Sequence, residues 1–79
     1  MAPPSRLDVV GTFCPIPVLL AVREMRRLKP GDRLELLGDD PAMREDVPAW
    51  CEHAGHRLVE ATEEPEGVLR FLVERGQRG

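Results

Sequence analysis

Two closely spaced prolines determine where the first helix of this chain can begin. Pro15 and Pro17 precede the apolar run 18–22. Proline is tolerated in the first turn of a helix because the backbone N–H groups there have no partners inside the helix. The spacing therefore predicts a helix over residues 15–28, with Cys14 at its N-cap. The partial positive charge of a helix N-terminus favours an anion, so we expect a bias of the Cys14 thiol toward thiolate, the form that attacks electrophiles.

Turn signals divide the rest of the chain into further strands and one more helix. Glycine, proline and aspartate cluster at residues 29–32, 38–41 and 64–67, and such clusters interrupt regular structure. Short alternating apolar segments between them predict strands, and a longer segment predicts a helix. The predicted strands are 6–10, 33–37, 57–62 and 68–74, and the second helix is 41–54. The short turn at 64–67 predicts that the last two strands pair as a hairpin.

The predicted order is β-α-β-α-β-β, and each element has one apolar side. Pro48 interrupts the second helix, and we expect it to kink that helix or shorten its start. Apolar side chains recur at helical spacing on the helices and alternate on the strands. Those expected to face the core are Val18, Ala21, Val22, Met25 and Leu28, then Met43, Val47, Trp50 and Ala54, and on strands Leu34, Leu36, Leu69, Phe71 and Val73. We expect both helices to cover one face of a small mixed sheet.

The length and composition indicate one small domain. The 79 residues are 42% apolar and 32% charged, which suits one modest core. We expect a single domain over residues 6–75 between flexible tails at 1–5 and 76–79. The net charge of −3 argues against strong direct binding of nucleic acid through its phosphates. No apolar run approaches the length of about 20 residues that a membrane helix needs, so we expect a cytoplasmic protein, with a monomer as its simplest state.

The two cysteines are expected to remain free thiols. Cys51 lies about nine residues into the second helix, roughly 13 Å from its start, whereas bridged cysteines need α-carbons within about 7 Å. Its expected role, beside Trp50, is core packing. His53 and His56 are expected at the opposite end of the domain from Cys14, which argues against a Cys–His catalytic pair. Their spacing fits no standard zinc site, so we expect no metal and no cofactor.

Charged side chains set the expected reactivity of Cys14. Asp39 and Asp40 end the neighbouring strand at the same edge of the sheet, and their negative charge opposes ionisation of the thiol. Arg44 is expected to offset that charge. The helix end contributes only about 0.3–1 kcal/mol at an exposed site. We therefore expect Cys14 to be a moderate nucleophile rather than a fully ionised one.

Three arginines form a basic patch on the first helix, namely Arg23, Arg26 and Arg27. One interpretation is an ordinary solvated face. The other is a docking surface for an acidic partner, or for RNA that another protein mainly holds. The residues alone leave both open.

The same residues carry a resemblance to a known family. From Leu7 to Arg75 the chain closely resembles the TusA/SirA-like sulfur-carrier proteins. The Cys-Pro-x-Pro element is specific in the context of the other shared residues. The shared pattern is Asp8, Gly11, Cys14-Pro15-x-Pro17, Pro30-Gly31-Asp32, Asp39-Asp40-Pro41, Asp46-Val47-Pro48, Trp50-Cys51 and Gly55-His56.

The resemblance implies both a fold and a chemistry. The implied fold is a two-layer α/β sandwich with a four-stranded mixed sheet. Cys14 would accept sulfane sulfur as a persulfide from a cysteine desulfurase or a rhodanese and pass it to an acceptor sulfurtransferase, as a carrier rather than a stand-alone enzyme. Gly11, Pro15 and Pro17 would support the motif at the helix N-terminus. Phe13 and Ile16 would form an apolar collar that docks partners.

The residues leave the destination of the sulfur and two other functions open. Carriers of this kind serve tRNA 2-thiouridine synthesis, molybdenum-cofactor sulfuration and sulfur oxidation. A non-catalytic interaction or regulatory module would keep its activity without the Cys14 thiol but lose it on charge reversal in the basic patch. A thiol redox protein is disfavoured because no Cys-x-x-Cys pair supplies a resolving cysteine.

Overall fold

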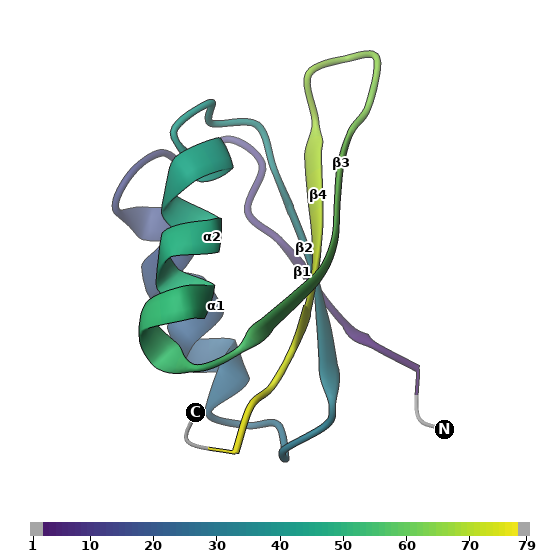
Figure 1. Cartoon of the computed structure of the whole chain (residues 1–79). Coiled ribbons are helices and arrows are strands. Elements are labelled where there is room, and N and C mark those ends of the chain that lie inside the picture. Colours follow the sequence, from purple (N-terminus) through teal and green to yellow (C-terminus); the bar gives the residue numbers. More distant parts are fainter. Residues whose placement is uncertain (1–2, 78–79) are drawn as a thin grey trace.

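Four strands and two helices form two layers. The computed structural model describes residues 3–77. Its elements are β1 (Ser5–Asp8), α1 (Ile16–Met25), β2 (Arg33–Gly38), α2 (Met43–Ala54), β3 (Arg57–Glu63) and β4 (Leu69–Glu74). The sheet order is β1-β2-β4-β3, with β1 parallel to β2 and the other neighbours antiparallel. Both helices lie on one face of this sheet (Figure 1). The predicted two-layer α/β sandwich is confirmed.

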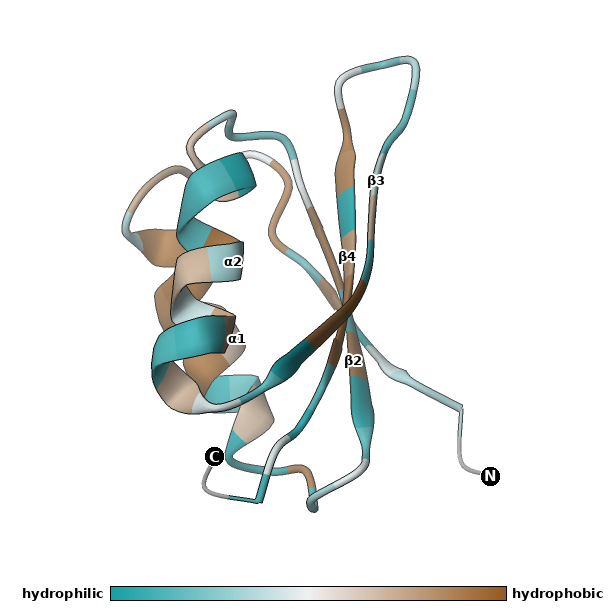
Figure 2. Cartoon of the chain, in the orientation of Figure 1, coloured by the Kyte–Doolittle hydropathy of each residue, from teal (hydrophilic) through white to brown (hydrophobic). Residues whose placement is uncertain are grey.

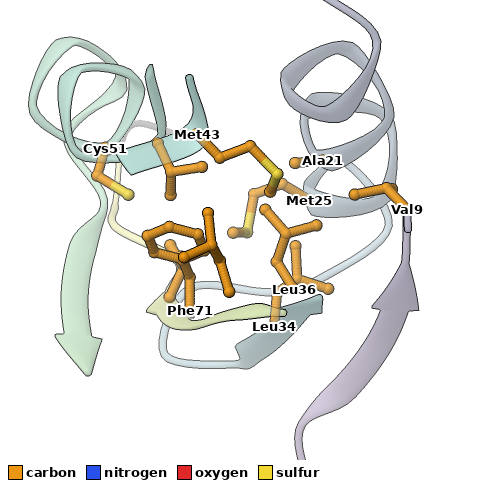
Figure 3. Packing of buried hydrophobic residues seen from close by; sticks show 11 residues of the cluster. Val9, Ala21, Met25, Leu34, Leu36, Met43, Cys51 and Phe71 are labelled. Carbon is orange, nitrogen blue, oxygen red and sulfur yellow. The ribbon is translucent and has the colours of Figure 1, made fainter. Parts of the chain in front are cut away.

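The core lies between the helices and the apolar face of the two central strands. Leu34 pairs with Val73 across the β2–β4 ladder, and Leu36 pairs with Phe71. These four side chains are at most 3% exposed, because alternate residues of a strand point to the same face. The helices contribute Ala21, Met25, Met43, Val47 and Cys51, and Figure 3 shows most of this cluster from close by.

Several predicted core positions are only partly buried, namely Val18, Val22 and Leu28 in and after α1, and Trp50 and Ala54 on α2. Trp50 is only partly buried and packs against the edge of the cluster, whereas the adjacent Cys51 is 2% exposed within it. Cys51 follows Met43 and Val47 at helical spacing, so the buried stripe of α2 continues through Cys51. The expectation that Cys51 is a packing residue is confirmed.

Tight turns shorten both helices relative to their predicted ranges. Arg27 and Leu28 donate backbone hydrogen bonds to Glu24 and Met25. These three-residue bonds are typical of a 3₁₀ turn, so α1 ends at Met25 rather than at residue 28. A similar turn precedes α2, where Met43 donates to the carbonyl of Asp40 at 2.9 Å. The second helix therefore begins two residues later than predicted.

Pro48 lies inside α2, where it has no N–H to donate to the carbonyl one turn earlier. The C-terminal end of this helix matches the prediction: it ends at Ala54, and Gly55 follows with a left-handed φ of 79°. That conformation is nearly free of strain in glycine.

The strands begin and end within two residues of their predicted bounds. The β3–β4 hairpin is confirmed, and its turn closes with a hydrogen bond from Gly67 N–H to the carbonyl of Glu64.

Ser5 already belongs to β1, one residue inside the predicted N-terminal tail. Gly76, which we expect in the C-terminal tail, donates its N–H to Nδ1 of His56 at 3.0 Å. The other predicted tail residues 1, 2, 78 and 79 lie outside the described residues.

The other face of the sheet carries ion pairs in place of helices. Arg6 on β1 lies 3.8 Å from Glu35 on β2. Arg70 on β4 links Glu35, at 2.5 Å, to Glu60 on β3, at 3.2 Å. Alternating charges therefore cross all four strands of this helix-free face.

Within the part of the chain that the structure describes, neither helix has the length and apolar character needed to cross a membrane.

Candidate functional site

The loop between β1 and α1 carries Cys14 at the surface. Val9 continues the parallel pairing of β1 by donating to the carbonyl of Leu37 at 2.7 Å. Thr12 then closes a turn onto the carbonyl of Val9 through its backbone N–H, at 3.1 Å, and its hydroxyl, at 2.7 Å. Gly11 has a φ of 90° inside this turn, a conformation that favours glycine. The chain reverses within a few residues and leaves Cys14 exposed.

Two aspartates from the β2–α2 connection hold this loop. The carboxylate of Asp39 accepts the backbone N–H of Gly11 at 3.0 Å. The two oxygens of Asp40 accept the N–H of Cys14 at 2.7 Å and that of Ala42 at 3.1 Å. Asp40 thus connects the cysteine to the chain leading into α2. We expect these aspartates to act as charges near the thiol and to cap the second helix, and the structure adds that they anchor the backbone of the Cys14 loop.

Cys14 lies one residue before the N-cap of α1. The cap is Pro15, without a side-chain capping bond, and Ile16 is the first helical residue. The predicted N-cap position of Cys14 is therefore wrong by one residue. Ile16 donates its N–H to the carbonyl of Phe13 at 2.9 Å, so this group is not directed at the thiol. Pro17, in the same turn, is buried.

The carboxylate of Asp46 dominates the electrostatics of the thiol. It raises the pKa of Cys14 through a hydrogen bond, and smaller contributions come from partial loss of hydration and from the charges of Asp46 and Asp40. The expected bias toward thiolate is not found, because the hydrogen bond to Asp46 favours the protonated thiol and raises its pKa. The expected opposing effect of Asp40 is present.

Asp46 is the site residue that sequence reasoning missed. It lies in the first turn of α2, where the acidic side chains are Glu45 and Asp46. The sequence holds one indication of its location, because both helices are expected to begin at the same edge of the sheet. An acidic residue in the first turn of α2, on the side facing α1, then lies close to Cys14.

Arg44 does not offset the aspartates as expected. Its guanidinium forms an ion pair with Glu63 at the end of β3. That pairing raises the pKa of Arg44. Arg44 therefore ties α2 to the hairpin instead of facing Asp39 and Asp40.

Exposed apolar side chains surround Cys14 in the sequence. Among residues 3–77, the large apolar side chains that are exposed are all within residues 10–19, and we name them the apolar patch: Val10 at 46%, Phe13 at 72%, Ile16 at 41% and Leu19 at 56% exposure. Leu19 follows Ile16 at the i,i+3 spacing of helical neighbours. Apolar side chains gathered in this way mark an interaction surface more often than scattered ones do.

The basic patch continues from the apolar patch along α1. Arg23 lies four residues after Leu19, so the two side chains are neighbours on the helix. Arg23, Arg26 and Arg27 are all exposed, and Arg27 lies 3.7 Å from Glu24. The exposed side of α1 thus changes from apolar to basic away from Cys14.

The second cysteine and the histidines lie apart from this loop. Burial raises the pKa of the Cys51 thiol to about 11. His53 is exposed in the last turn of α2, and His56 packs edge-on against Trp50 with ring centres 5.3 Å apart. Among residues 3–77, no group of three or more His, Cys, Asp or Glu side chains could hold a metal ion.

We predict that Asp46→Asn makes Cys14 more reactive at neutral pH. The amide carries no charge and donates to a thiolate, so the pKa of Cys14 falls toward its ordinary value and more thiolate is present. The rate of alkylation by iodoacetamide, measured across a pH series, should reach its half-maximum at lower pH than in the wild type. The matched control Glu45→Gln, on the neighbouring exposed carboxylate, should keep the wild-type profile. An unchanged profile for Asp46→Asn would contradict this role.

The chain is similar to known proteins over most of its length. The family model described as sulfurtransferase TusA matches residues 5–75. A protein of Archaeoglobus fulgidus that is named as a sulfur carrier protein is 39% identical over 69 residues, which cover 87% of this chain and 90% of that protein. The crystal structure of a SirA-like protein from Desulfitobacterium hafniense has a TM-score of 0.80 at 27% identity, and the match covers 91% of this chain and 97% of that one.

Proposed function

This chain belongs to the sulfurtransferase TusA family, and from that membership we propose that Cys14 accepts sulfane sulfur as a persulfide and passes it to an acceptor protein. The observation that carries the proposal is the exposure of Cys14 on a loop anchored by Asp39 and Asp40. A relay thiol must reach sulfur atoms on two different proteins. An exposed thiol on an anchored loop meets that requirement.

In the proposed transfer, the sulfur of Cys14 attacks the outer sulfur of a persulfide on the donor. A new S–S bond forms at Cys14 while the S–S bond of the donor breaks, and the donor leaves as a thiol with the proton that Cys14 loses. In the second half, an acceptor thiol attacks the outer sulfur on Cys14. That sulfur is transferred to the acceptor, and Cys14 is released as a thiol. Electrons and sulfur balance in each half, so the relay needs no oxidant and no reductant.

The proposed partners are a cysteine desulfurase or a rhodanese as donor and a sulfurtransferase as acceptor. The apolar patch supports docking around the thiol, since apolar side chains at the centre of an interface contribute most to binding. The basic patch supports a partner with an acidic rim, because complementary charge speeds encounter and fixes orientation. We propose that the relay operates in the cytoplasm as a monomer and leads to tRNA thiolation, molybdenum-cofactor sulfuration or sulfur oxidation.

Sulfur loading tests this function directly. The protein is incubated with a cysteine desulfurase and cysteine, and its intact mass is measured before and after treatment with dithiothreitol. One sulfur atom should appear, map to the peptide that contains Cys14, and be removed by the reductant. The reaction without cysteine is the control. A protein that never gains sulfur would overturn the proposal.

A non-catalytic interaction module is a second candidate that the apolar patch favours. The relay requires the Cys14 thiol, whereas an interaction module does not, because binding alone needs no sulfur chemistry. Charge reversal at Arg23, Arg26 and Arg27 would then abolish the biological activity, while replacing Cys14 would preserve it. Complementation of a carrier-deficient strain by both variants separates the two functions.

A further inference from the structure

A groove of about 500 Å³ lies beside Val10. It is lined by Asp8 at the end of β1, by Leu37 of β2, and by the β3–β4 turn. Leu37 follows the core residue Leu36 and therefore points to the helix-free face of the sheet. The hairpin extends beyond the rest of the sheet (Figure 1), and its turn is largely hydrophilic (Figure 2). The groove is thus separate from the exposed side of α1.

The groove combines an apolar lining with unbalanced negative charge. Val10, Leu37 and Val68 supply apolar surface, and Asp8, Glu64 and Glu66 supply carboxylates. In the described part of the chain, no basic side chain lies within 4.0 Å of these three carboxylates. Arg6 also lines the groove, with its guanidinium 3.8 Å from Glu35, so three carboxylates and one guanidinium line the groove.

Val10 connects this groove to the reactive loop. It belongs to the apolar patch and is 46% exposed. It lies only four positions before Cys14, so the two α-carbons are at most about 14 Å apart. A segment that fills the groove therefore contacts a residue whose α-carbon lies within about 14 Å of the α-carbon of Cys14.

We propose that this groove is a docking site for a protein partner, through a segment that carries both basic and apolar side chains. The proposal rests on the proposed relay, in which a partner must approach Cys14. The excess of carboxylates over basic groups in the lining favours positive charge, and the apolar lining buries aliphatic side chains. On the other side of the loop the arginines of the basic patch select negative charge. The carrier can thus distinguish two partners of opposite charge that use the same thiol.

A peptide titration tests the groove without a known partner. The ¹⁵N-labelled protein is titrated with a hexapeptide of alternating leucine and arginine, and separately with one of alternating leucine and glutamate. The basic peptide should shift the amide signals of Val10, Leu37 and the turn at 64–67, more weakly as ionic strength rises. The acidic peptide should leave these signals in place.

Charge reversal provides the matched variants. The double variant Glu64→Lys/Glu66→Lys should weaken binding of the basic peptide about tenfold, since each exposed charge contact changes affinity a few fold and reversal replaces attraction by repulsion. The control Glu45→Lys/Glu52→Lys changes the net charge equally on the exposed surface of α2 and should bind as the wild type does. Equal weakening in both variants, equal binding of both peptides, or shifts confined to α1 would overturn the proposal. Shifts of the groove signals on dilution without peptide would identify a second copy of the chain as the occupant and would also overturn it.

Failure of this proposal is distinguishable from failure of the relay. Absent peptide binding together with normal sulfur loading removes the groove as a docking site and leaves the carrier function intact. Absent loading of Cys14 removes the relay, while the peptide titration still reports on the groove.

Discussion

We expect a Cys14→Ser variant to take up no sulfur from a desulfurase and cysteine, and the wild type to take up one atom. A hydroxyl group cannot form the S–S bond that holds sulfane sulfur, and the other thiol cannot replace it. Cys51 is 2% exposed, and burial raises its pKa to about 11. Because Cys14 is exposed, its replacement should leave the free energy of unfolding within about 0.5 kcal/mol of the wild-type value. Intact mass and urea unfolding measure the two quantities.

The reciprocal control is Cys51→Ala. It should load sulfur as the wild type does but lose about 1 kcal/mol of unfolding free energy, because the sulfur atom of Cys51 fills part of the core. Sulfur bound to Cys51 in the wild type, or continued loading of Cys14→Ser, would contradict the assignment of the relay to Cys14.

An Asp40→Ala variant is expected to lose about 2 kcal/mol of unfolding free energy, or about 10 °C in melting temperature. The substitution removes the acceptor for two backbone N–H groups, those of Cys14 and Ala42. Both groups lie where the chain turns into a helix. Amide hydrogen exchange of Cys14 should also accelerate, which distinguishes release of the loop from a general loss of stability.

Two further variants calibrate this effect. Asp39→Ala removes one such bond, to Gly11, and should cost about half as much. Asp40→Asn keeps one acceptor oxygen and should fall between Asp40→Ala and the wild type. If Asp40→Ala leaves the exchange rate of Cys14 unchanged, the aspartate does not anchor the loop in solution.

Most of the fold follows from local patterns in the sequence. Leu34 and Leu36 alternate with polar residues, and the β2 strand is found at that place with both leucines buried. Gly55 ends α2 because few other residues adopt its backbone conformation without strain. The errors in the helix bounds arise where a 3₁₀ turn and an α-helical turn differ by one hydrogen bond. Local sequence separates these two states only weakly.

The site follows from the sequence only in part. The exposed cysteine and its prolines are visible there because neighbouring residues determine how the helix begins. The role of Asp40 is not visible in the sequence, because its carboxylate accepts the N–H of Cys14, a residue 26 positions away. The pairing of Arg44 with Glu63 also joins residues that are far apart in the sequence. It contradicts the expectation, based on closeness in the sequence, that Arg44 offsets the charges of Asp39 and Asp40.

The sequence by itself determined the order of the elements, the buried sides of the strands and the position of the reactive thiol. These properties depend on residues that are neighbours in the chain. Only the tertiary structure decided that Asp46 raises the pKa of Cys14, that two aspartates hold its loop, and that a negatively charged groove reaches Val10. The reason is physical: electrostatic and hydrogen-bonding interactions depend on distances of a few ångströms. The packing of α2 and the hairpin against the rest of the domain sets those distances.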